Sequence, residues 1–473
     1  MTGLLLRDAE LGGRERADVR LAGGLIAEIG GGLARRPGER VVECGGGALL
    51  PGLCDHHLHL HALAAWRRSV VCGPPAVTGR DALAAVLRDA VPDEHGWVRG
   101  VGYAESVAGE LDAAALDALR PGGPVRVQHR SGALWILNSA AVRAAGLASA
   151  EHPGVERDAA GRPTGRLWRA DDWLRTRLPA APLVDLGPVG RELARLGVTA
   201  VTDATPDLGA GALAAIEAAV RDGTLPHRVH LLGLPPDAAP PPHPRLGTGP
   251  YKIVLADSGL PPLDELSARI RDAHGHGRPV AVHCVTREAL VLLLAAFEDA
   301  GIVDGDRIEH AALVPEVLVP ELARRGLRVV TQPGFLADRG DDYLRDVPAE
   351  DVPDLYRCRS LLDAGVPVAL SSDAPYGPLD PWAVMDAAVT RATRSGAVAG
   401  RDETVPAAAA LRSLLTGPEE PGGPPRRVST GEAADLVLLH VPLAEALHHL
   451  SADNVRATIT GGSLTAERHF RSS

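Results

Sequence analysis

The apolar positions of the chain follow two periods, and each period predicts its own kind of element. From about residue 190 to 415, short apolar runs alternate with longer stretches in which apolar residues recur every three to four positions. The short runs predict strands at residues 199–203, 228–232, 251–255, 280–284, 307–310, 328–332 and 367–373. The longer stretches predict helices at residues 212–222, 263–274, 287–300, 315–325 and 351–364. Repeated strand–helix units indicate a parallel sheet.

An eighth strand at residues 48–53 completes the count of a closed (β/α)8 TIM barrel, an α/β fold. An open, doubly wound sheet is the alternative. That fold usually carries a glycine-rich phosphate turn after its first strand, whereas the glycines at 45–47 precede the strand here. The pattern therefore favours the barrel.

The two ends of the chain read as β-structure. Strands at 19–22 and 25–29 flank Gly23-Gly24, which is typical of a hairpin, and a further strand follows at 41–44. Strands at 434–439 and 455–460 lie near the other end. We expect residues 1–50 and 425–473 to form a small β-sandwich, and residues 51–61 and 188–424 to form the barrel.

Residues 62–187 are too many for one helix between two barrel strands. We expect an insertion after the first strand that caps the barrel mouth. Its pattern predicts helices at 81–90, at 112–119 and from 138, with strands at 97–102 and 125–129.

Composition narrows the class of protein. The 473 residues carry a net charge of −11, so no basic face is available for nucleic acid. No apolar stretch is long enough to span a membrane, and the N-terminus lacks the features of a signal peptide. Five scattered cysteines suit free thiols in a reducing compartment. These features predict a cytoplasmic protein that acts on a small molecule.

Basic residues are distributed in an unusual way. The chain has 49 lysine and arginine residues, and only Lys252 is a lysine. It lies in the predicted strand at 251–255. Arginine replaces lysine wherever charge alone matters, so Lys252 marks a position where arginine would not serve. Chance survival of one lysine is the alternative.

Candidate chemistry gathers at the C-terminal ends of the predicted strands, where barrel enzymes hold their active sites. His57 and His59 share one face of the first strand because strand side chains alternate. A histidine-rich loop without function is the alternative for this pair alone. The other candidates come from four later strands: Lys252, His283, His310 and Asp373. Together these six side chains predict a metal site.

Several stretches resemble a known family. The sequence Asp55-His56-His57-Leu58-His59, the histidines at 283 and 310 in their strands, and Ser371-Ser372-Asp373-Ala374-Pro375 are similar to the metal motifs of the amidohydrolase superfamily. Residues 100–106, 129–132 with 138–141, 158–165 and Gln332-Pro333 resemble its family 3, the YtcJ-like branch that includes the N-substituted formamide deformylases. The resemblance runs almost from end to end.

The resemblance implies a metal centre with one or two divalent ions, zinc being the first choice and iron or manganese the alternatives. His57, His59 and Asp373 would hold one ion and His283 and His310 the other. An N6-carboxylated Lys252 would bridge the two ions. Some members use Glu at this position, and others bind one metal without a carbamate. The lysine could also be an unmodified cation of the pocket.

The implied reaction is hydrolysis of a C–N bond in an amide, formamide or cyclic amide by a metal-activated hydroxide. Asp373 would act as general base and then as general acid. With a single metal, His310 would polarise the carbonyl. Deamination of a ring amine at a mononuclear site is one alternative, and a non-catalytic binding protein on the same scaffold is the other.

Four further residues are candidates for contacts with substrate: Tyr103, His129, Arg130 and Gln332. Packing or surface roles are equally open for the first three, and Gln332 ends the predicted seventh strand. The resemblance also allows a homodimer.

Overall fold

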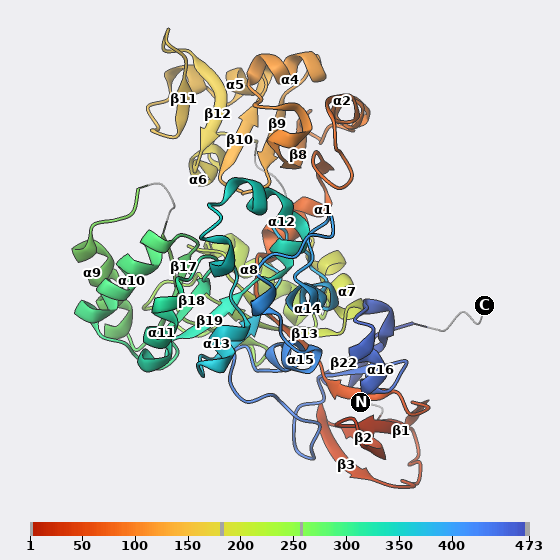
Figure 1. Ribbon diagram of the computed structural model, residues 1–473. Coiled ribbons are helices and arrows are strands. Elements are labelled where there is room, and N and C mark those ends of the chain that lie inside the picture. The colour runs from red at the N-terminus through yellow and green to blue at the C-terminus, as the bar shows by residue number, and fades with distance from the viewer. Residues whose placement is uncertain (1–2, 180–183, 256–258, 469–473) are drawn as a thin grey trace. The chain divides into compact units, whose positions relative to one another are not determined.

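The computed structural model describes residues 3–179, 184–255 and 259–468. The chain divides into two compact units. One comprises Met1–Leu60 with Asp185–Ser473, and the other is His61–Val184. Figure 1 shows the elements of both.

Both ends of the chain contribute to one eight-stranded sheet in the first unit. Its strands follow the order β23-β22-β21-β5-β1-β2-β3, with β4 paired to β1. The bounds are β1 (Leu4–Leu11), β2 (Glu15–Ala22), β3 (Leu25–Gly30), β4 (Arg40–Glu43), β5 (Ala48–Pro51), β21 (Leu436–Leu439), β22 (Val455–Thr460) and β23 (Ser463–Glu467). The predicted hairpin is confirmed, since β2 and β3 pair antiparallel around Gly23 and Gly24, which both have positive φ. A two-layer sandwich stays a prediction.

The remaining strands of this unit are parallel and form two sheets. One has the order β15-β14-β13-β6, built from β6 (Leu53–Leu58), β13 (Val198–Asp203), β14 (Arg228–Leu231) and β15 (Leu246–Thr248). The other runs β16-β17-β18-β19-β20, built from β16 (Tyr251–Val254), β17 (Val280–Cys284), β18 (Arg307–His310), β19 (Arg328–Thr331) and β20 (Val368–Leu370). All neighbours in both sheets pair in parallel, so the mixed α/β fold is confirmed.

Backbone hydrogen bonds join the two sheets. Lys252 on β16 donates its amide to the carbonyl of Leu232, just after β14. At the other edge Asp373, just after β20, donates to His57 of β6 over 2.8 Å. The strands still pair as two separate sheets, so a single closed barrel stays a prediction.

One predicted strand is wrong. The run 48–53 divides at Gly52, because β5 belongs to the terminal sheet and β6 begins the parallel one. The amide of Gly52 donates to Asp435, and a Cβ at Gly52 would lie 2.1 Å from the Thr199 side chain. Glycine lets the backbone pass this close while it moves from one sheet to the other. The dipeptide Pro51-Gly52 is a breaker signal at this point, but both halves of the run are apolar, so the pattern was interpreted as one strand.

Helices follow the parallel strands: α7 (Gly187–Arg195), α8 (Ala210–Arg221), α9 (Leu263–Gly275), α10 (Arg287–Ala300), α11 (Val319–Arg325), α12 (Gly334–Asp346), α13 (Arg359–Asp363), α14 (Pro381–Thr390) and α15 (Ala407–Leu414). Strand residues such as Val282 and Ile308 pack against Phe297 of α10 in a shared apolar core. Because side chains alternate along a strand, Lys252 and His283 face the opposite side of the sheet. This alternation separates the core from the polar site.

The His61–Val184 unit has its own core and sheet. The sheet order is β11-β12-β10-β9-β8-β7, with β7 (Val70–Val71), β8 (Val98–Tyr103), β9 (Val125–His129), β10 (Leu134–Leu137), β11 (Val155–Arg157) and β12 (Pro163–Trp168). Its helices include α2 (Arg80–Asp89), α4 (Ala113–Leu119) and α5 (Ser139–Ala144). The elements expected at 81–90, 97–102, 112–119, 125–129 and from 138 are therefore present. Asn138 begins the last of them, because its side chain accepts from the Ala141 amide.

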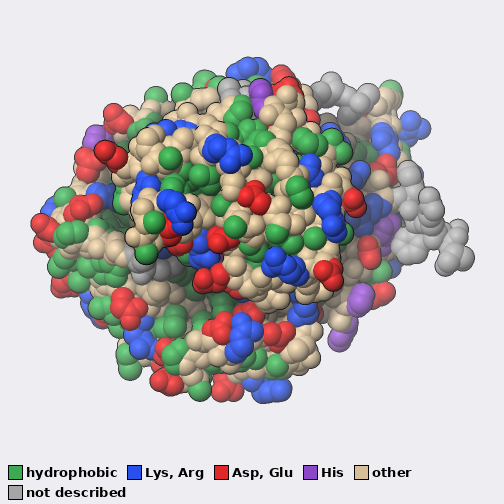
Figure 2. All heavy atoms as spheres, turned by 90° about the horizontal axis from the view of Figure 1, so that it is seen from above, with side chains coloured by type: hydrophobic (Ala, Val, Ile, Leu, Met, Phe, Trp, Pro, Cys, Tyr) green, Lys and Arg blue, Asp and Glu red, His purple; other side chains and the backbone are tan. Residues whose placement is uncertain are grey.

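The surface carries both signs of charge. On the face shown in Figure 2, acidic and basic side chains are interspersed. Ion pairs such as Arg324 with Glu321 and Arg345 with Asp342 neutralise charges locally. Across the described residues, no helix combines the length and the apolar character that crossing a membrane requires.

Candidate metal centre

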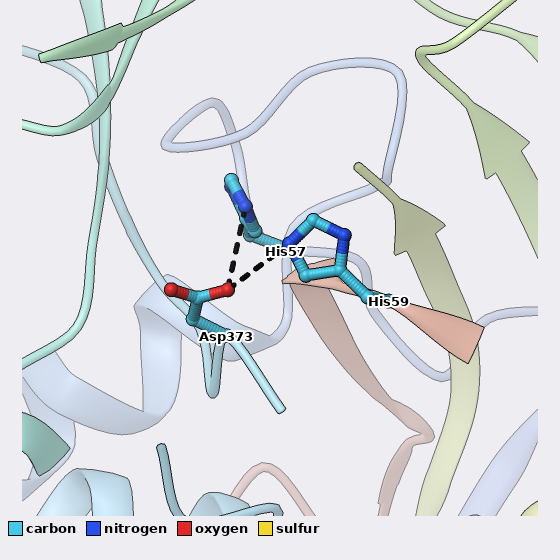
Figure 3. Close-up of side chains that lie close together, drawn as sticks. All are labelled: His57, His59 and Asp373. Atoms are coloured by element: carbon cyan, nitrogen blue, oxygen red, sulfur yellow. Dashed lines mark ion pairs between the residues drawn. The ribbon is translucent and has the colours of Figure 1, made fainter. Parts of the chain in front are cut away.

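Three predicted ligands meet where β6 and β20 end. His57 lies in β6, His59 one residue beyond it, and Asp373 three residues beyond β20. The Nε2 atoms of His57 and His59 lie 3.6 and 3.2 Å from Oδ1 of Asp373 (Figure 3). One donor atom from each residue falls within 4.8 Å of the others, which is compatible with one shared metal ion.

Unusual backbone geometry presents two site residues. His310 and Asp373 have φ of 70° and 52°, in the left-handed region that side chains other than glycine seldom adopt. The backbone amide of Asp373 donates a hydrogen bond to the carbonyl of His57. The amide of His59 donates to the carbonyl of Ala374 over 2.9 Å. Such backbone is costly and persists where surrounding contacts enforce it, often at functional sites.

Asp55 links the two strand ends behind the ligands. Its carboxylate accepts hydrogen bonds from the His57 amide and from both the amide and the hydroxyl of Ser372. Complete burial raises the pKa of Asp55 to about 6. The side chain thus fixes the spacing between β6 and the stretch that follows β20.

Four imidazoles form a continuous row. Ring centroids lie 5.4 Å apart between His59 and His57, 4.8 Å between His57 and His310, and 4.4 Å between His310 and His283. Burial lowers the pKa of His57 and of His310 well below the usual value. Both rings are therefore neutral near pH 7, as metal ligands must be.

The second ring nitrogen of three of these histidines has its own contact. Nδ1 of His57 meets the Glu309 carboxylate, and Nδ1 of His310 lies 2.8 Å from Oε1 of Gln332. Nδ1 of His59 lies 3.4 Å from the Thr205 hydroxyl. Outer contacts of this kind orient metal-ligating imidazoles.

Lys252 is 4% exposed, and its Nζ has no hydrogen-bond partner within the described part of the chain. Burial lowers the pKa of the amine, and the positive charge of Arg307 adds to this effect against Glu309 and Asp373. A lowered pKa favours the neutral amine that carbamate formation needs. Lys252 on β16 lies opposite Ala281 on the neighbouring strand β17, and Ala281 is two residues before His283.

These residues fit a divalent metal. Nε2 of His57, Oδ1 of Asp373 and Nζ of Lys252 are buried atoms to which the described residues offer no hydrogen bond. Buried polar atoms in proteins are normally satisfied, so these three atoms indicate a missing partner. Imidazole nitrogen and carboxylate oxygen are ligands suited to zinc, iron or manganese.

Three of the four predicted substrate contacts have hydrogen-bond partners in the described structure. Tyr103, His129 and Arg130 belong to the His61–Val184 unit. The Tyr103 hydroxyl donates to the Gly109 carbonyl, and His129 contacts Glu105 and Ser131. Gln332 is fully buried between His310 and the Ser371 hydroxyl. This geometry favours a role for Gln332 in orienting His310, and contact of any of the four with substrate stays a prediction.

Sequence reasoning missed the outer layer of the site. The sequence patterns assigned no role to Glu309, Asp55, Thr205 or Ser372. One signal was available: Glu309 is an acid within a buried strand, and such residues are almost always paired. Its partner could not be read from the sequence, because His57 lies 252 residues away.

Comparison with known proteins agrees with this geometry. The profile of the amidohydrolase family matches residues 40–466. The chain belongs to the amidohydrolase family. An N-substituted formamide deformylase from Arthrobacter pascens is 27% identical to this amidohydrolase over 95% of both chains.

Solved structures show the same fold. An uncharacterized metal-dependent hydrolase from Pyrococcus horikoshii matches with a TM-score of 0.76 at 20% identity, covering 95% of this chain and all of the other. A hydrolase of the same description from Pyrococcus furiosus matches with a TM-score of 0.71 at 21% identity, over 93% of this chain and 99% of the other. This amidohydrolase is accordingly a metal-dependent hydrolase of C–N bonds.

Proposed function

We propose that this amidohydrolase cleaves the C–N bond of an amide, formamide or cyclic amide. His57, His59 and Asp373 would hold one divalent ion, zinc in the first instance. His283 and His310 would hold a second ion, bridged to the first by N6-carboxylated Lys252. The similarity to the N-substituted formamide deformylase from Arthrobacter pascens supports a formamide as the substrate within this class.

The observation that carries the proposal is a set of three buried atoms to which the described residues offer no hydrogen bond: His57 Nε2, Asp373 Oδ1 and Lys252 Nζ. His57 approaches Asp373 to 3.6 Å without forming a hydrogen bond. Burying such groups without a partner is unfavourable. A bound ion would satisfy the imidazole and the carboxylate, and a carbamate would satisfy the amine.

When bound, the divalent metal would lower the pKa of a water molecule and polarise the scissile carbonyl. Asp373 accepts the proton of the attacking water and delivers it to the leaving nitrogen. His310 lies between His57 and His283 in the row of rings, with Nδ1 held by Gln332. Nε2 of His310 is then the atom directed at a ligand or, with one metal, at the carbonyl oxygen.

The domain roles belong to the same proposal. The two parallel sheets would act as one barrel, supported by the backbone bonds from Lys252 to Leu232 and from Asp373 to His57. The terminal strands would form the β-sandwich, and the enzyme would work in the cytoplasm as a homodimer.

The test is an activity screen of N-formyl, N-acyl and cyclic amides after loading with zinc, manganese or iron. We expect amine and carboxylate release from at least one substrate, with loss after treatment with a chelator and recovery on addition of metal. Release of ammonia from a ring amine would instead support a mononuclear deaminase. A protein that binds no metal after reconstitution would refute the proposal.

Lys252→Ala tests the bridge. We expect activity to fall by at least about 100-fold, because a displaced bridge also misplaces the attacking water, with partial recovery from added short-chain carboxylic acids. Arg278→Ala is a control for loss of a buried cation, because Arg278 donates only to backbone carbonyls such as Gly249 and Leu234. Added carboxylic acid should not restore that variant. Full activity in Lys252→Ala would exclude the bridging role.

A further inference from the structure

We propose that Glu309 is the positioning residue of the metal centre. Its carboxylate accepts the hydrogen bond of Nδ1–H of His57 and so directs the lone pair of Nε2 toward Asp373, while Arg307 holds Glu309 in place. The inference rests on the proposed function, because it takes His57 to be a ligand through Nε2.

The contacts form a line of three buried side chains. Arg307 and Glu309 lie two residues apart on β18 and therefore on the same face. Nε of Arg307 donates to Oε1 of Glu309 over 2.6 Å, and Oε2 of Glu309 meets Nδ1 of His57. All three are at most 1% exposed, so water does not compete for these bonds.

Proton assignment follows from the chemistry of the groups. An ionised carboxylate only accepts hydrogen bonds, so the proton of the neutral imidazole must sit on Nδ1. Nε2 then carries the lone pair. That atom has no hydrogen-bond partner among the residues described and lies 3.6 Å from Oδ1 of Asp373. The three contacts therefore leave the lone pair of His57 Nε2 available for a ligand.

Charge explains why an arginine stands behind the carboxylate. A buried carboxylate without a counter-charge is strongly unfavourable. Arg307 is always protonated and supplies that charge from the same strand. Nη1 and Nη2 of Arg307 find no hydrogen-bond partner in the described chain, so its one hydrogen-bonded nitrogen is the one that serves Glu309.

Glu309 differs from the partners of the other histidines. Gln332, beside His310, and Thr205, beside His59, can each donate or accept. Of the three partners, only the carboxylate of Glu309 has no hydrogen-bond donor of its own. Its acceptor role toward His57 therefore does not depend on how the side chain is turned.

Glu309→Gln is the direct test, because the amide keeps the size of the side chain and can donate to Nδ1. We expect the zinc dissociation constant, measured by chelator competition on the full chain, to rise about 10–100-fold. In the metal-free protein labelled with 15N-histidine, the His57 signals should change from a pure Nδ1–H tautomer to a mixture. His57→Gln assigns those signals.

Asp306→Asn is the matched control. Asp306 contacts Nε2 of His274 at 3.1 Å and accepts from the Val280 amide, so it is another buried carboxylate paired with a histidine in the same unit. This variant should lose stability without a change in zinc affinity. A purely structural role for Glu309 would give Glu309→Gln the same behaviour.

A double variant covers the case in which Glu309→Gln does not fold. Arg307→Met with Glu309→Leu removes both charges together, which proteins often tolerate. We expect it to fold and to bind zinc as weakly as Glu309→Gln. Wild-type affinity in a folded variant lacking Glu309, with an unchanged His57 tautomer, would overturn this inference. Absence of zinc binding in the wild-type protein would instead overturn the proposed function.

Discussion

His230 offers a quantitative test of how this fold treats a buried imidazole. It lies in β14, is 6% exposed, and its ring packs against the backbone of the neighbouring strand, where a Cβ at Gly249 would lie 2.7 Å from Nε2. Nδ1 has no hydrogen-bond partner in the described structure. Burial, followed by the charge of Arg307, lowers the pKa of His230 from 6.5 to about 3.

The lowered pKa makes stability depend on pH in a defined direction. Between pH 6.5 and pH 3 the unfolded chain binds a proton at His230 and the folded chain does not, so stability falls as the pH falls. At pH 5 the unfolded histidine is about 1.5 pH units below its pKa, which corresponds to a loss of roughly 2 kcal/mol relative to neutral pH. His230→Gln should abolish this contribution, because glutamine does not titrate.

Hydrogen exchange of the amides in β13 and β14 measures the opening free energy of this region without requiring both units to unfold together. We expect the difference between pH 7 and pH 5 to be about 2 kcal/mol smaller in metal-free His230→Gln than in the wild-type protein. His276→Gln is the control, because His276 is exposed at the end of α9. Equal pH dependence in wild type and His230→Gln would refute the reasoning.

Two further substitutions test the site and the core. Asp373→Asn keeps the shape of the side chain but cannot accept the proton of water. We therefore expect kcat, measured by product release, to fall about 100- to 10,000-fold. A near-normal kcat would exclude Asp373 as the base. Arg357→Met leaves Glu403 buried without the partner it now contacts at 2.6 Å, so unfolding in urea should require about 3–5 kcal/mol less. Arg345→Met, at an exposed pair, is its control, and equal effects of the two variants would contradict the argument.

Much of the fold could be predicted because parallel strands buried on both faces are nearly continuous apolar runs. Residues 280–284 show this, since β17 has the predicted bounds. Helix α10 was also predicted with its observed bounds, because its apolar residues recur with helical period. The strands β1, β7, β10, β11, β12, β15 and β23 were not predicted.

Some features of the candidate site could also be predicted from the sequence, and others could not. Strand alternation placed His57 and His59 on one side, and the structure brings both to Asp373. The rarity of lysine singled out Lys252, which is buried beside the other candidates. Gln332 is a predicted substrate contact; the structure shows its amide at His310 and Ser371, and contact with substrate stays a prediction.

The sequence by itself determined which residue types stand at the ends of the strands and which face of each strand they occupy, because both follow from local periodicity. Only the tertiary structure decided how those ends are spaced and that Nε2 of His57 is left without a hydrogen bond from the described residues. Glu309 and His57 are 252 residues apart, and their hydrogen bond exists only after two strands from distant parts of the chain are brought together. Local patterns cannot encode that distance, and the proton on His57 depends on it.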